Sequence, residues 1–292
     1  MAAPLRWEGE GVRLAEVDAA LARLRGEAAR EAPSMRTSVM THVAWVPARW
    51  VEQARGALAG MEERHPSRTI LLFPEPDAAE SRLDASAAVQ RFELPGSGRG
   101  LVTEVVELHL RGARAAAPAS VVEPLLISEL PVFLRWRGEP PWGADELAQL
   151  VGLTDRLIVD STEWEGLPGS YARLAELFEG AATSDIAWAR TSRWRSLLAS
   201  LWPGIAEVRT IRVRGTEAQA LLLAGWLRAR LGRDEIALEH EPAEKLLGIA
   251  LDGEDAPFPP GDPPNPSDVL SDELDRFTRD PVYEAAVTAA VR

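Results

Sequence analysis

Short apolar runs of strand length alternate with helix-like segments over residues 33–162, and this pattern restricts the possible folds most. Residues 69–73, 132–136 and 156–160 have their apolar residues in continuous runs rather than at every second position, with charged residues only at 135, 156 and 160. Such runs are typical of strands that are covered on both faces of a sheet, with helices in the connections. The pattern predicts an α/β layer structure, preceded by an amphipathic helix over residues 12–30.

One stretch of this region has the order strand, helix, strand. Residues 37–46 alternate as a half-buried strand does, and Pro47 suits the first turn of a helix because its missing N–H costs nothing there. The strand at 69–73 follows, so the unit is compatible with a parallel crossover. Two further strands, 87–94 and 101–110, are joined by a glycine-rich turn.

A second α/β unit follows a polar stretch at residues 162–170, which contains two Gly and one Pro. Its clearest element is a helix that begins at Thr216, with Gln219 three residues later as the capping-box partner and Gly232 as terminator. A length near 300 residues also favours two domains over one. We predict two domains, each a mixed β-sheet flanked by helices, over residues 1–165 and 166–292.

The C-terminal part of the second domain has a different character. Residues 257–266 contain six prolines, so we predict an extended linker over residues 256–267. A helical tail over residues 268–292 follows, in which Asp280 and Pro281 mark the start of the last helix.

Composition excludes several classes of function. The formal net charge is −13, which argues against a nucleic-acid partner because phosphates would be repelled over most of the surface. The chain has no cysteine, so it has no disulfides, thiolate metal sites or cysteine nucleophiles. No apolar run approaches the ~20 residues that cross a bilayer, and no secretory signal precedes residue 12. We expect a cytoplasmic protein that does not bind membranes.

The common signatures of catalysis and cofactor binding are missing. The glycines at 96–100 lack the Lys-Ser/Thr ending of a phosphate loop and precede a strand rather than a helix. No Gly-x-Ser-x-Gly elbow occurs, and Val159-Asp160-Ser161 fits a strand end better than a nucleophile site. The four histidines lack the spacing of paired metal ligands; they are His42, His65, His109 and His240. We therefore assign no catalytic, cofactor-binding or metal-binding residue.

Aromatic and arginine residues cluster in two places instead. The first cluster couples the apolar strand at 132–136, which ends in Trp136, to a proline-containing loop with Trp142. The second places two Trp and three Arg within eleven residues, 185–195. Such clusters can bind an anion, pack internally through Arg–Trp stacking or contact another protein, and the residues alone favour internal packing.

An ordered set of motifs resembles one known family. The motifs are Arg36-Thr-Ser, His65-Pro-Ser-Arg-Thr-Ile70, Pro124-Leu-Leu-Ile-Ser-Glu-Leu-Pro-Val-Phe-Leu134, Leu157-Ile-Val-Asp-Ser161, Asp185-Ile-Ala-Trp-Ala-Arg190, Trp194-Arg195, Leu222-Leu-Ala-Gly-Trp-Leu227, Asp272-Glu-Leu and Asp280-Pro-Val-Tyr283. Together they are similar to the glucose-6-phosphate dehydrogenase assembly protein family (OpcA), over roughly residues 33–290.

The resemblance implies a non-catalytic partner of glucose-6-phosphate dehydrogenase, an assembly protein or allosteric activator in the oxidative pentose phosphate pathway. It also implies an N-terminal and a C-terminal family domain that meet near residue 165. It carries over no catalytic residue. Thiol-based control, discussed for relatives, is chemically impossible in a chain without cysteine.

Two hypotheses therefore stand, each with its own residues. In the first, the dehydrogenase is bound through Trp136, Trp142, Trp188, Arg190, Trp194, Arg195, Asp272 and Tyr283, although the tail helices can instead pack back on their own domain. In the alternative, the chain is a sugar-phosphate or nucleotide-binding regulatory protein, or an unrecognised enzyme, in which Arg36, Arg68, Arg190 or Arg195 would hold phosphate.

Overall fold

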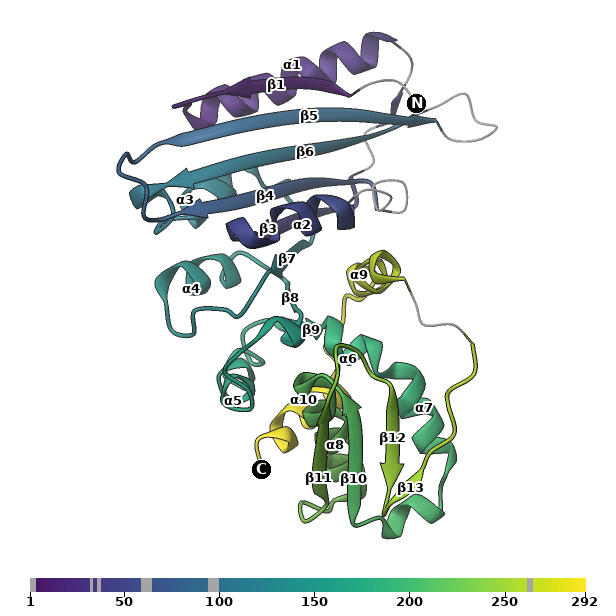
Figure 1. Ribbon diagram of the computed structural model, residues 1–292. Helices are drawn as coiled ribbons and strands as arrows, with labels where there is room; N and C mark the ends of the chain where they lie inside the picture. The colour runs from purple at the N-terminus through teal and green to yellow at the C-terminus, as the bar shows by residue number, and fades with distance from the viewer. Residues whose placement is uncertain (1–3, 32–33, 36–37, 59–64, 94–99, 262–264) are drawn as a thin grey trace. The chain divides into compact units, whose positions relative to one another are not determined.

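The structure is a computed structural model that describes residues 4–31, 34–35, 38–58, 65–93, 100–261 and 265–292 (Figure 1). It is mixed α/β with two β-sheets, which confirms the α/β part of the predicted fold class. The chain divides into two compact units, Met1–Leu157 and Ile158–Arg292. The division falls within strand β8 (Arg156–Val159), upstream of the polar stretch 162–170 where the sequence predicts the domain boundary.

The first unit is built on a mixed sheet with the strand order β1-β5-β6-β4-β3-β7. Strands β3, β4 and β7 are mutually parallel where they pair, β4 is parallel to β6, and β5 is antiparallel to both β6 and β1. The parallel pairing of β3 with β4 confirms the predicted crossover. The bounds are β1 (Leu5–Gly9), β2 (Ser34–Met35, paired with β6), β3 (Met40–Trp45), β4 (Ser67–Glu75), β5 (Leu83–Glu93), β6 (Gly100–Arg111) and β7 (Val132–Trp136).

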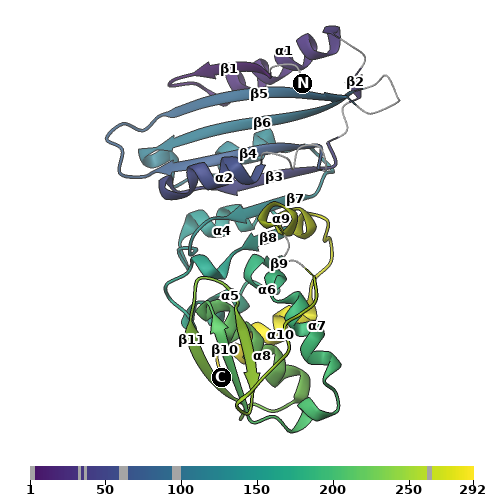
Figure 2. The same ribbon diagram turned by 45° about the vertical axis from the view of Figure 1, so that its right-hand side comes forward.

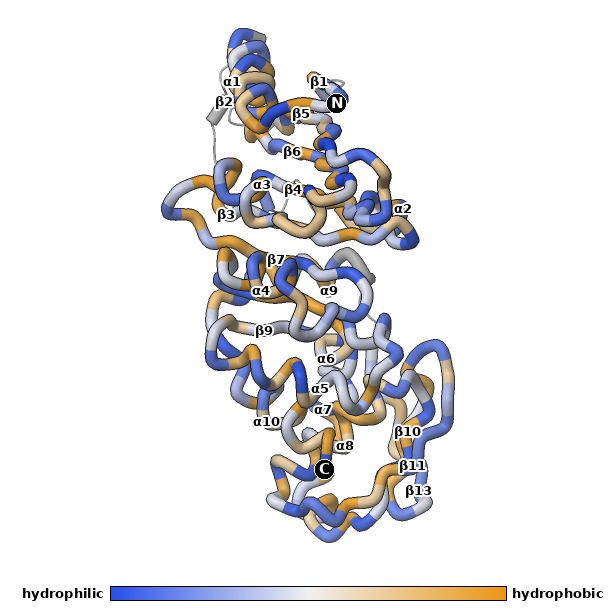
Figure 3. Tube along the Cα trace, turned by 90° about the vertical axis from the view of Figure 1, so that its left-hand side faces the viewer, coloured by the Kyte–Doolittle hydropathy of each residue, from blue (hydrophilic) through white to orange (hydrophobic). Residues whose placement is uncertain are grey.

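Helices cover both faces of this sheet. Helix α1 (Leu14–Glu31) turns its apolar stripe inward, and Val17, Leu21 and Leu24 are buried. Figure 3 shows the alternation of polar and apolar residues along α1, and it places α1 and α3 (Ala119–Val122) on the opposite face of the sheet from α2 (Val51–Leu58). Helix α4 (Asp145–Val151) follows β7.

One strand of this sheet differs from its prediction. The alternation in residues 37–46 predicts a half-buried strand, but every residue of β3 is buried. The reason is position: β3 lies between β4 and β7 inside the sheet rather than at an edge, and helices cover both faces of this sheet (Figure 3). The polar side chains of Thr41 and His42 are therefore buried as well.

The second unit holds the other sheet, with the order β11-β10-β12-β13. Strands β10 and β11 are parallel, and the remaining pairs are antiparallel. The unit also contains the end of β8 and the whole of β9, and three short α-helices follow β8 in the sequence before β10. The bounds are β9 (Ala182–Asp185), β10 (Thr210–Gly215), β11 (Ala237–Pro242), β12 (Gly248–Leu251), β13 (Glu254–Asp255), α5 (Gly169–Ala175), α6 (Ile186–Arg190) and α7 (Ser192–Ser200).

Helix α8 (Glu217–Leu231) begins and ends where the sequence predicts. The Thr216 hydroxyl accepts from the Gln219 backbone N–H and the Gln219 side chain accepts from the Thr216 N–H, each at 3.3 Å. Gly232 ends the helix with φ of 65°, a left-handed conformation that glycine adopts without strain. Local residues thus set both ends of this helix.

The C-terminal segment forms two helices, α9 (Pro266–Leu274) and α10 (Pro281–Ala290). Asp280 caps α10, because its carboxylate accepts from the backbone N–H groups of Val282 and Tyr283 at 3.0 Å. Helix α10 lies alongside α8 in Figures 1 and 2, and residues that face α8 are buried. The predicted linker is partly fixed, because the Arg193 guanidinium donates to the carbonyl oxygens of Pro259 and Pro260 at 2.8 and 2.6 Å and also to that of Gly261.

Candidate functional site

Polar side chains of the second unit gather where β8 and β9 end. Asp160 follows β8 and accepts from the Thr162 hydroxyl at 2.6 Å and the Thr162 N–H at 3.2 Å, so it caps a short 3-10 helix over residues 161–163. Asp185 ends β9 and accepts from the Ala187 N–H at 2.8 Å, so it caps α6. Both carboxylates are fixed by the helices that they begin.

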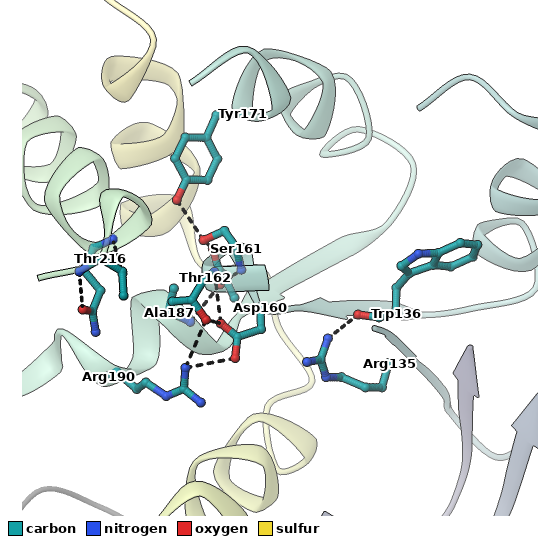
Figure 4. A network of polar contacts seen from close by, with 11 residues as sticks. Arg135, Trp136, Asp160, Ser161, Thr162, Tyr171, Ala187, Arg190 and Thr216 are labelled. Atoms are coloured by element: carbon teal, nitrogen blue, oxygen red, sulfur yellow. Dashed lines mark hydrogen bonds and ion pairs between the residues drawn. The ribbon is translucent and has the colours of Figure 1, made fainter. Parts of the chain in front are cut away.

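Asp185 is the centre of this buried cluster, and Figure 4 shows its neighbours Ser161 and Tyr171 together with Asp160 and Thr162. Asp185 accepts from the backbone N–H of Ser161 at 3.0 Å and from the Ser161 hydroxyl at 2.6 Å. The Tyr171 hydroxyl lies 2.8 Å from the Ser161 hydroxyl, and the Tyr283 hydroxyl lies 3.5 Å from Asp185. One carboxylate thus connects the end of β8, helices α5 and α6, and the C-terminal helix α10.

Burial shifts the pKa values of the acidic groups in this cluster. Burial, and after it the nearby Asp160 carboxylate, raises the pKa of Asp185 to about 7, against the hydrogen bonds from Ser161 and Ala187, which lower it. Burial also raises the pKa of the Tyr171 and Tyr283 hydroxyls above their usual range. Asp160 has a cation beside it, since Arg190 Nη1 lies 3.0 Å from its Oδ2. Ser161 and Asp185 are fully buried, so neither presents a group to solvent in this structure.

The second aromatic and arginine cluster lies next to Asp185. The guanidinium carbon of Arg195 is 3.4 Å from the centre of the Trp188 ring, a cation–π contact. Trp188 Nε1 donates to the Asp280 carboxylate at 3.1 Å, and the Trp188 and Tyr283 rings lie 5.7 Å apart. Burial lowers the pKa of Arg195 to about 10. The structure therefore brings Trp188, Arg195, Asp280 and Tyr283 together, and all four help to fix α10.

Helix α10 approaches α8 more closely than side chains normally allow. A Cβ added at Gly225 would lie 2.1 Å from the Ala286 carbonyl oxygen and 2.8 Å from the Ala290 nitrogen. The two helices therefore touch backbone to backbone at Gly225. Packing on its own domain, which the sequence left open for the tail, is the arrangement that this structure has.

The remaining predicted partner-binding residues are Trp136, Trp142, Trp194 and Asp272. Trp136 is buried and stacks on Trp45 with ring centres 4.9 Å apart, and its carbonyl oxygen accepts from the Arg135 guanidinium (Figure 4). Trp142 is half-buried and donates to Glu139 at 3.1 Å. Trp194 is buried against Phe258, and Asp272 is exposed.

Arg68 and Arg36, two of the four arginines of the alternative hypothesis, have different outcomes. Arg68 is buried, its Nε donates to Glu104 at 2.7 Å, and its Nη1 donates to the Leu125 carbonyl oxygen at 2.6 Å. Its guanidinium is therefore occupied inside the first unit. Arg36 lies outside the described residues.

Sequence reasoning missed the roles of Ser161, Tyr171 and Asp185. A local signal existed for Asp185, because an Asp directly before a helical segment is typical of an N-cap. The burial of His42 beside Arg135 and His65 was also not predicted. Burial, followed by these two neighbours, lowers the His42 pKa to about 4. In the described part of the chain, neither ring nitrogen of His42 has a hydrogen-bond partner.

The described residues form neither a metal site nor a membrane-spanning helix. Among them, no group of three or more His, Cys, Asp or Glu side chains is placed to hold a metal ion. Within the same ranges, none of the helices has the length and apolar character that a membrane crossing requires.

Comparison with known proteins gives matches along most of the chain. Residues 58–176 match a family model described as the N-terminal domain of a glucose-6-phosphate dehydrogenase subunit. Residues 181–257 match a second model, which is described as the C-terminal domain of the same protein. The two matches occur in the order that the descriptions imply.

Curated relatives from three cyanobacteria are each described as an OxPP cycle protein OpcA. The relative from Nostoc punctiforme is 27% identical over 194 residues, which are 62% of this chain and 41% of the relative. Those from Synechocystis and Synechococcus elongatus are 24% and 28% identical, over 61% and 53% of this chain and 40% and 39% of the relatives. The matches thus span about two fifths of each relative. With both domain models matched in order, the chain belongs to the OpcA family of glucose-6-phosphate dehydrogenase assembly proteins.

Proposed function

We propose that this protein is a non-catalytic partner of glucose-6-phosphate dehydrogenase that acts in the oxidative pentose phosphate cycle. The observation that carries the proposal is the ordered match to two domain models, both described as parts of a glucose-6-phosphate dehydrogenase subunit. The descriptions of the cyanobacterial relatives as OxPP cycle proteins support the same pathway.

The proposed action is a shift in the state of the enzyme. A partner that binds the active or assembled state more tightly than the inactive state increases the population of the former. A tenfold shift requires only ~1.4 kcal/mol of differential binding. A single well-placed aromatic contact can supply this much, so the protein needs no catalytic group of its own to activate the enzyme.

The buried tryptophans have a supporting role in this proposal. Trp136, Trp188 and Trp194 are buried, and a buried ring cannot touch a second protein unless the fold rearranges. We infer that they hold the surface that binds the dehydrogenase in place, and that exposed residues near them make the contact. Asp272 and the half-buried Trp142 stay as predicted contact residues.

Binding and activity together test the proposal. The protein is mixed with glucose-6-phosphate dehydrogenase from the same organism, and the mixture is analysed by size-exclusion chromatography and by steady-state kinetics. We expect co-elution at micromolar concentrations, and a higher kcat or a lower KM for glucose 6-phosphate. The absence of both co-elution and any kinetic change would refute the proposal.

The alternative, a sensor of sugar phosphates or nucleotides, has less support because Arg68 is occupied by Glu104. A thermal-shift series with glucose 6-phosphate, 6-phosphogluconate and pyridine nucleotides tests it directly. A ligand present at a hundred times its Kd should stabilise the fold by ~2.7 kcal/mol. The proposed function predicts no shift of this size when the dehydrogenase is absent.

A further inference from the structure

The sheet of the second unit has one open face. Along β10, Ile211 and Val213 are buried, whereas Arg212 and Arg214 alternate with them and are exposed. The strand register places small residues of β12 beside these arginines, since Arg212 pairs with Ala250 and Arg214 with Gly248. The open face therefore has two guanidinium groups on β10 and almost no side-chain volume on β12, while β11 pairs Glu239 with Arg212 and Glu241 with Arg214.

A cavity of about 390 Å³ lies on this face. It is lined by Trp194, Arg212, Arg214, Glu241, Leu247, Gly248, Ile249, Ala250, Asp255, Ala256 and Phe258. The lining combines apolar side chains, the Trp194–Phe258 pair and Ala256, with the guanidinium groups of Arg212 and Arg214. An occupant must therefore present an apolar group and a polar group at the same time.

The apolar wall is fixed in place although it is exposed. Phe258 is 65% exposed, and its ring lies edge-on against Trp194 with ring centres 5.3 Å apart. The Ala256 N–H donates to the Ile249 carbonyl oxygen at 2.8 Å on one side of Phe258. On the other side, Arg193 donates to the carbonyl oxygens of Pro259 and Pro260. A rigid aromatic side chain at the surface can bind a partner with little loss of conformational entropy.

The two arginines differ in their partners. Arg212 Nε donates to Glu239 at 2.9 Å, so its charge is already balanced. Arg214 makes no ion pair within the described part of the chain, and the missing side chain at Gly248 leaves room beside its guanidinium, where an added Cβ would lie 3.7 Å from Nη2. A planar guanidinium with free N–H donors binds carboxylates in two-pronged fashion.

The carboxylates in the cavity select the kind of anion. Glu241 and Asp255 also line it, and a doubly charged phosphate ester would be repelled by both. A single carboxylate on a peptide segment meets less repulsion and can be positioned by an apolar neighbour against Phe258 and Leu247, which is 38% exposed. The charge pattern and the exposed apolar rim therefore favour a protein segment over a sugar phosphate.

We propose that this groove binds a segment of glucose-6-phosphate dehydrogenase that carries an Asp or Glu next to a large apolar residue. The carboxylate pairs with Arg214, and the apolar side chain packs against Phe258 and Leu247. This inference rests on the proposed function and adds to it a binding surface and the chemistry of the bound segment.

Substitutions at the groove test the proposal in the full-length protein. Arg214→Glu reverses the charge that binds the carboxylate, and Phe258→Ala removes the apolar wall. We expect each to raise the Kd for the dehydrogenase at least tenfold. Arg230→Glu is the matched control, because Arg230 is an exposed arginine of α8 outside the groove, and we expect its Kd to stay within twofold of wild type. Thermal melts verify that all three variants are folded.

A cross-linking experiment identifies the occupant. The chain has no cysteine, so Leu247→Cys introduces a single thiol at the rim for a photoreactive label, and Arg230→Cys is its control. We expect the label at 247 to cross-link a dehydrogenase peptide that contains Asp or Glu beside an aromatic or branched aliphatic residue. The label at 230 should not cross-link this peptide.

The outcomes separate this inference from the proposed function. If wild type binds the dehydrogenase and the groove variants bind equally well, the groove is not the docking site and the proposed function stands. If wild type does not bind, both proposals fail. If glucose 6-phosphate stabilises wild type and Arg214→Glu abolishes that stabilisation, the groove is a metabolite site and the docking proposal is wrong.

Discussion

Asp185 combines complete burial with hydrogen bonds from three chain segments. Its pKa is raised from 3.8 to about 7 in the fold, so between these values the folded protein holds a proton that the unfolded chain has released. The stability that Asp185 contributes is therefore full below about pH 4 and is lost as the pH rises to 7.

We predict that Asp185→Asn removes this pH dependence. The asparagine Oδ1 can still accept from the backbone N–H groups of Ser161 and Ala187, and its Nδ2 can donate to the Ser161 hydroxyl, so the site stays hydrogen-bonded without a titratable group. Urea unfolding of both proteins from pH 4 to pH 8 measures the effect. The free energy of unfolding of wild type, taken relative to that of the variant, should fall as the pH rises from 4 to about 7 and should then level off. A difference that stays constant with pH would contradict the raised pKa.

Arg68 gives a second residue-scale prediction. Its partner Glu104 is buried, and Arg68→Ala leaves that carboxylate with Arg25 alone, 3.3 Å away. We expect a loss of about 3–5 kcal/mol in the free energy of unfolding. Arg55→Ala is the control, since its ion pair with Glu107 is partly exposed, and it should cost less than about 1 kcal/mol. Equal losses of unfolding free energy in both variants would show that the burial of an ion pair does not determine how much its removal destabilises the protein.

At the scale of elements, the contact between α8 and α10 depends on Gly225. We predict that Gly225→Ala separates the two helices and destabilises the protein by about 1–3 kcal/mol or more, because the new methyl group would overlap the α10 backbone. Gly56→Ala in α2 is the control. Nothing lies within 4 Å of a Cβ added there, so this variant should gain up to ~1 kcal/mol from the better helix propensity of alanine.

Thermal melts of the two glycine variants distinguish packing from propensity. A lower Tm for the Gly225 variant together with an unchanged or higher Tm for the Gly56 variant is the expected result. A higher Tm for both would mean that α10 does not press against Gly225 in solution.

The elements that sequence predicts best are those with local determinants. The capping box at Thr216 and the terminator Gly232 fix α8 within a few residues, and both were predicted. Strands β1 and β9 were not predicted, because the polar run Ala182–Asp185 has no apolar pattern and becomes a strand only through its neighbour β8. The buried state of β3 likewise depends on sheet order, which no local pattern encodes.

In the candidate site, too, the features with local sequence signals were predicted and the tertiary contacts were not. The sequence singled out Trp188, Arg195 and Tyr283, and the structure brings them together. No local sequence pattern connects Ser161 with Asp185 and Tyr283, because these residues come together only in the tertiary fold. The groove at Arg214 was also missed, since its floor is formed by strand pairing between β10 and β12.

At the scale of the whole molecule, the absence of cysteine leads to a prediction about regulation. No reversible thiol chemistry is available to a chain without a thiol. We predict that dithiothreitol and oxidised glutathione leave the Tm of this protein unchanged. In binding assays with the dehydrogenase, any redox effect must then follow the cysteines of the dehydrogenase, which substitution of those cysteines can verify. A Tm that responds to either reagent with the isolated protein would contradict this.

The hydrogen bond between Tyr283 and Asp185 joins residues that are 98 positions apart. Closing so long a loop costs entropy before the contact returns any enthalpy, and folds with many such contacts form slowly. The last helix cannot pack on Asp185 until the intervening strands and α8 have taken their places. We expect the second unit to fold in one late, cooperative step, and a fragment without α10 to remain open and prone to proteolysis.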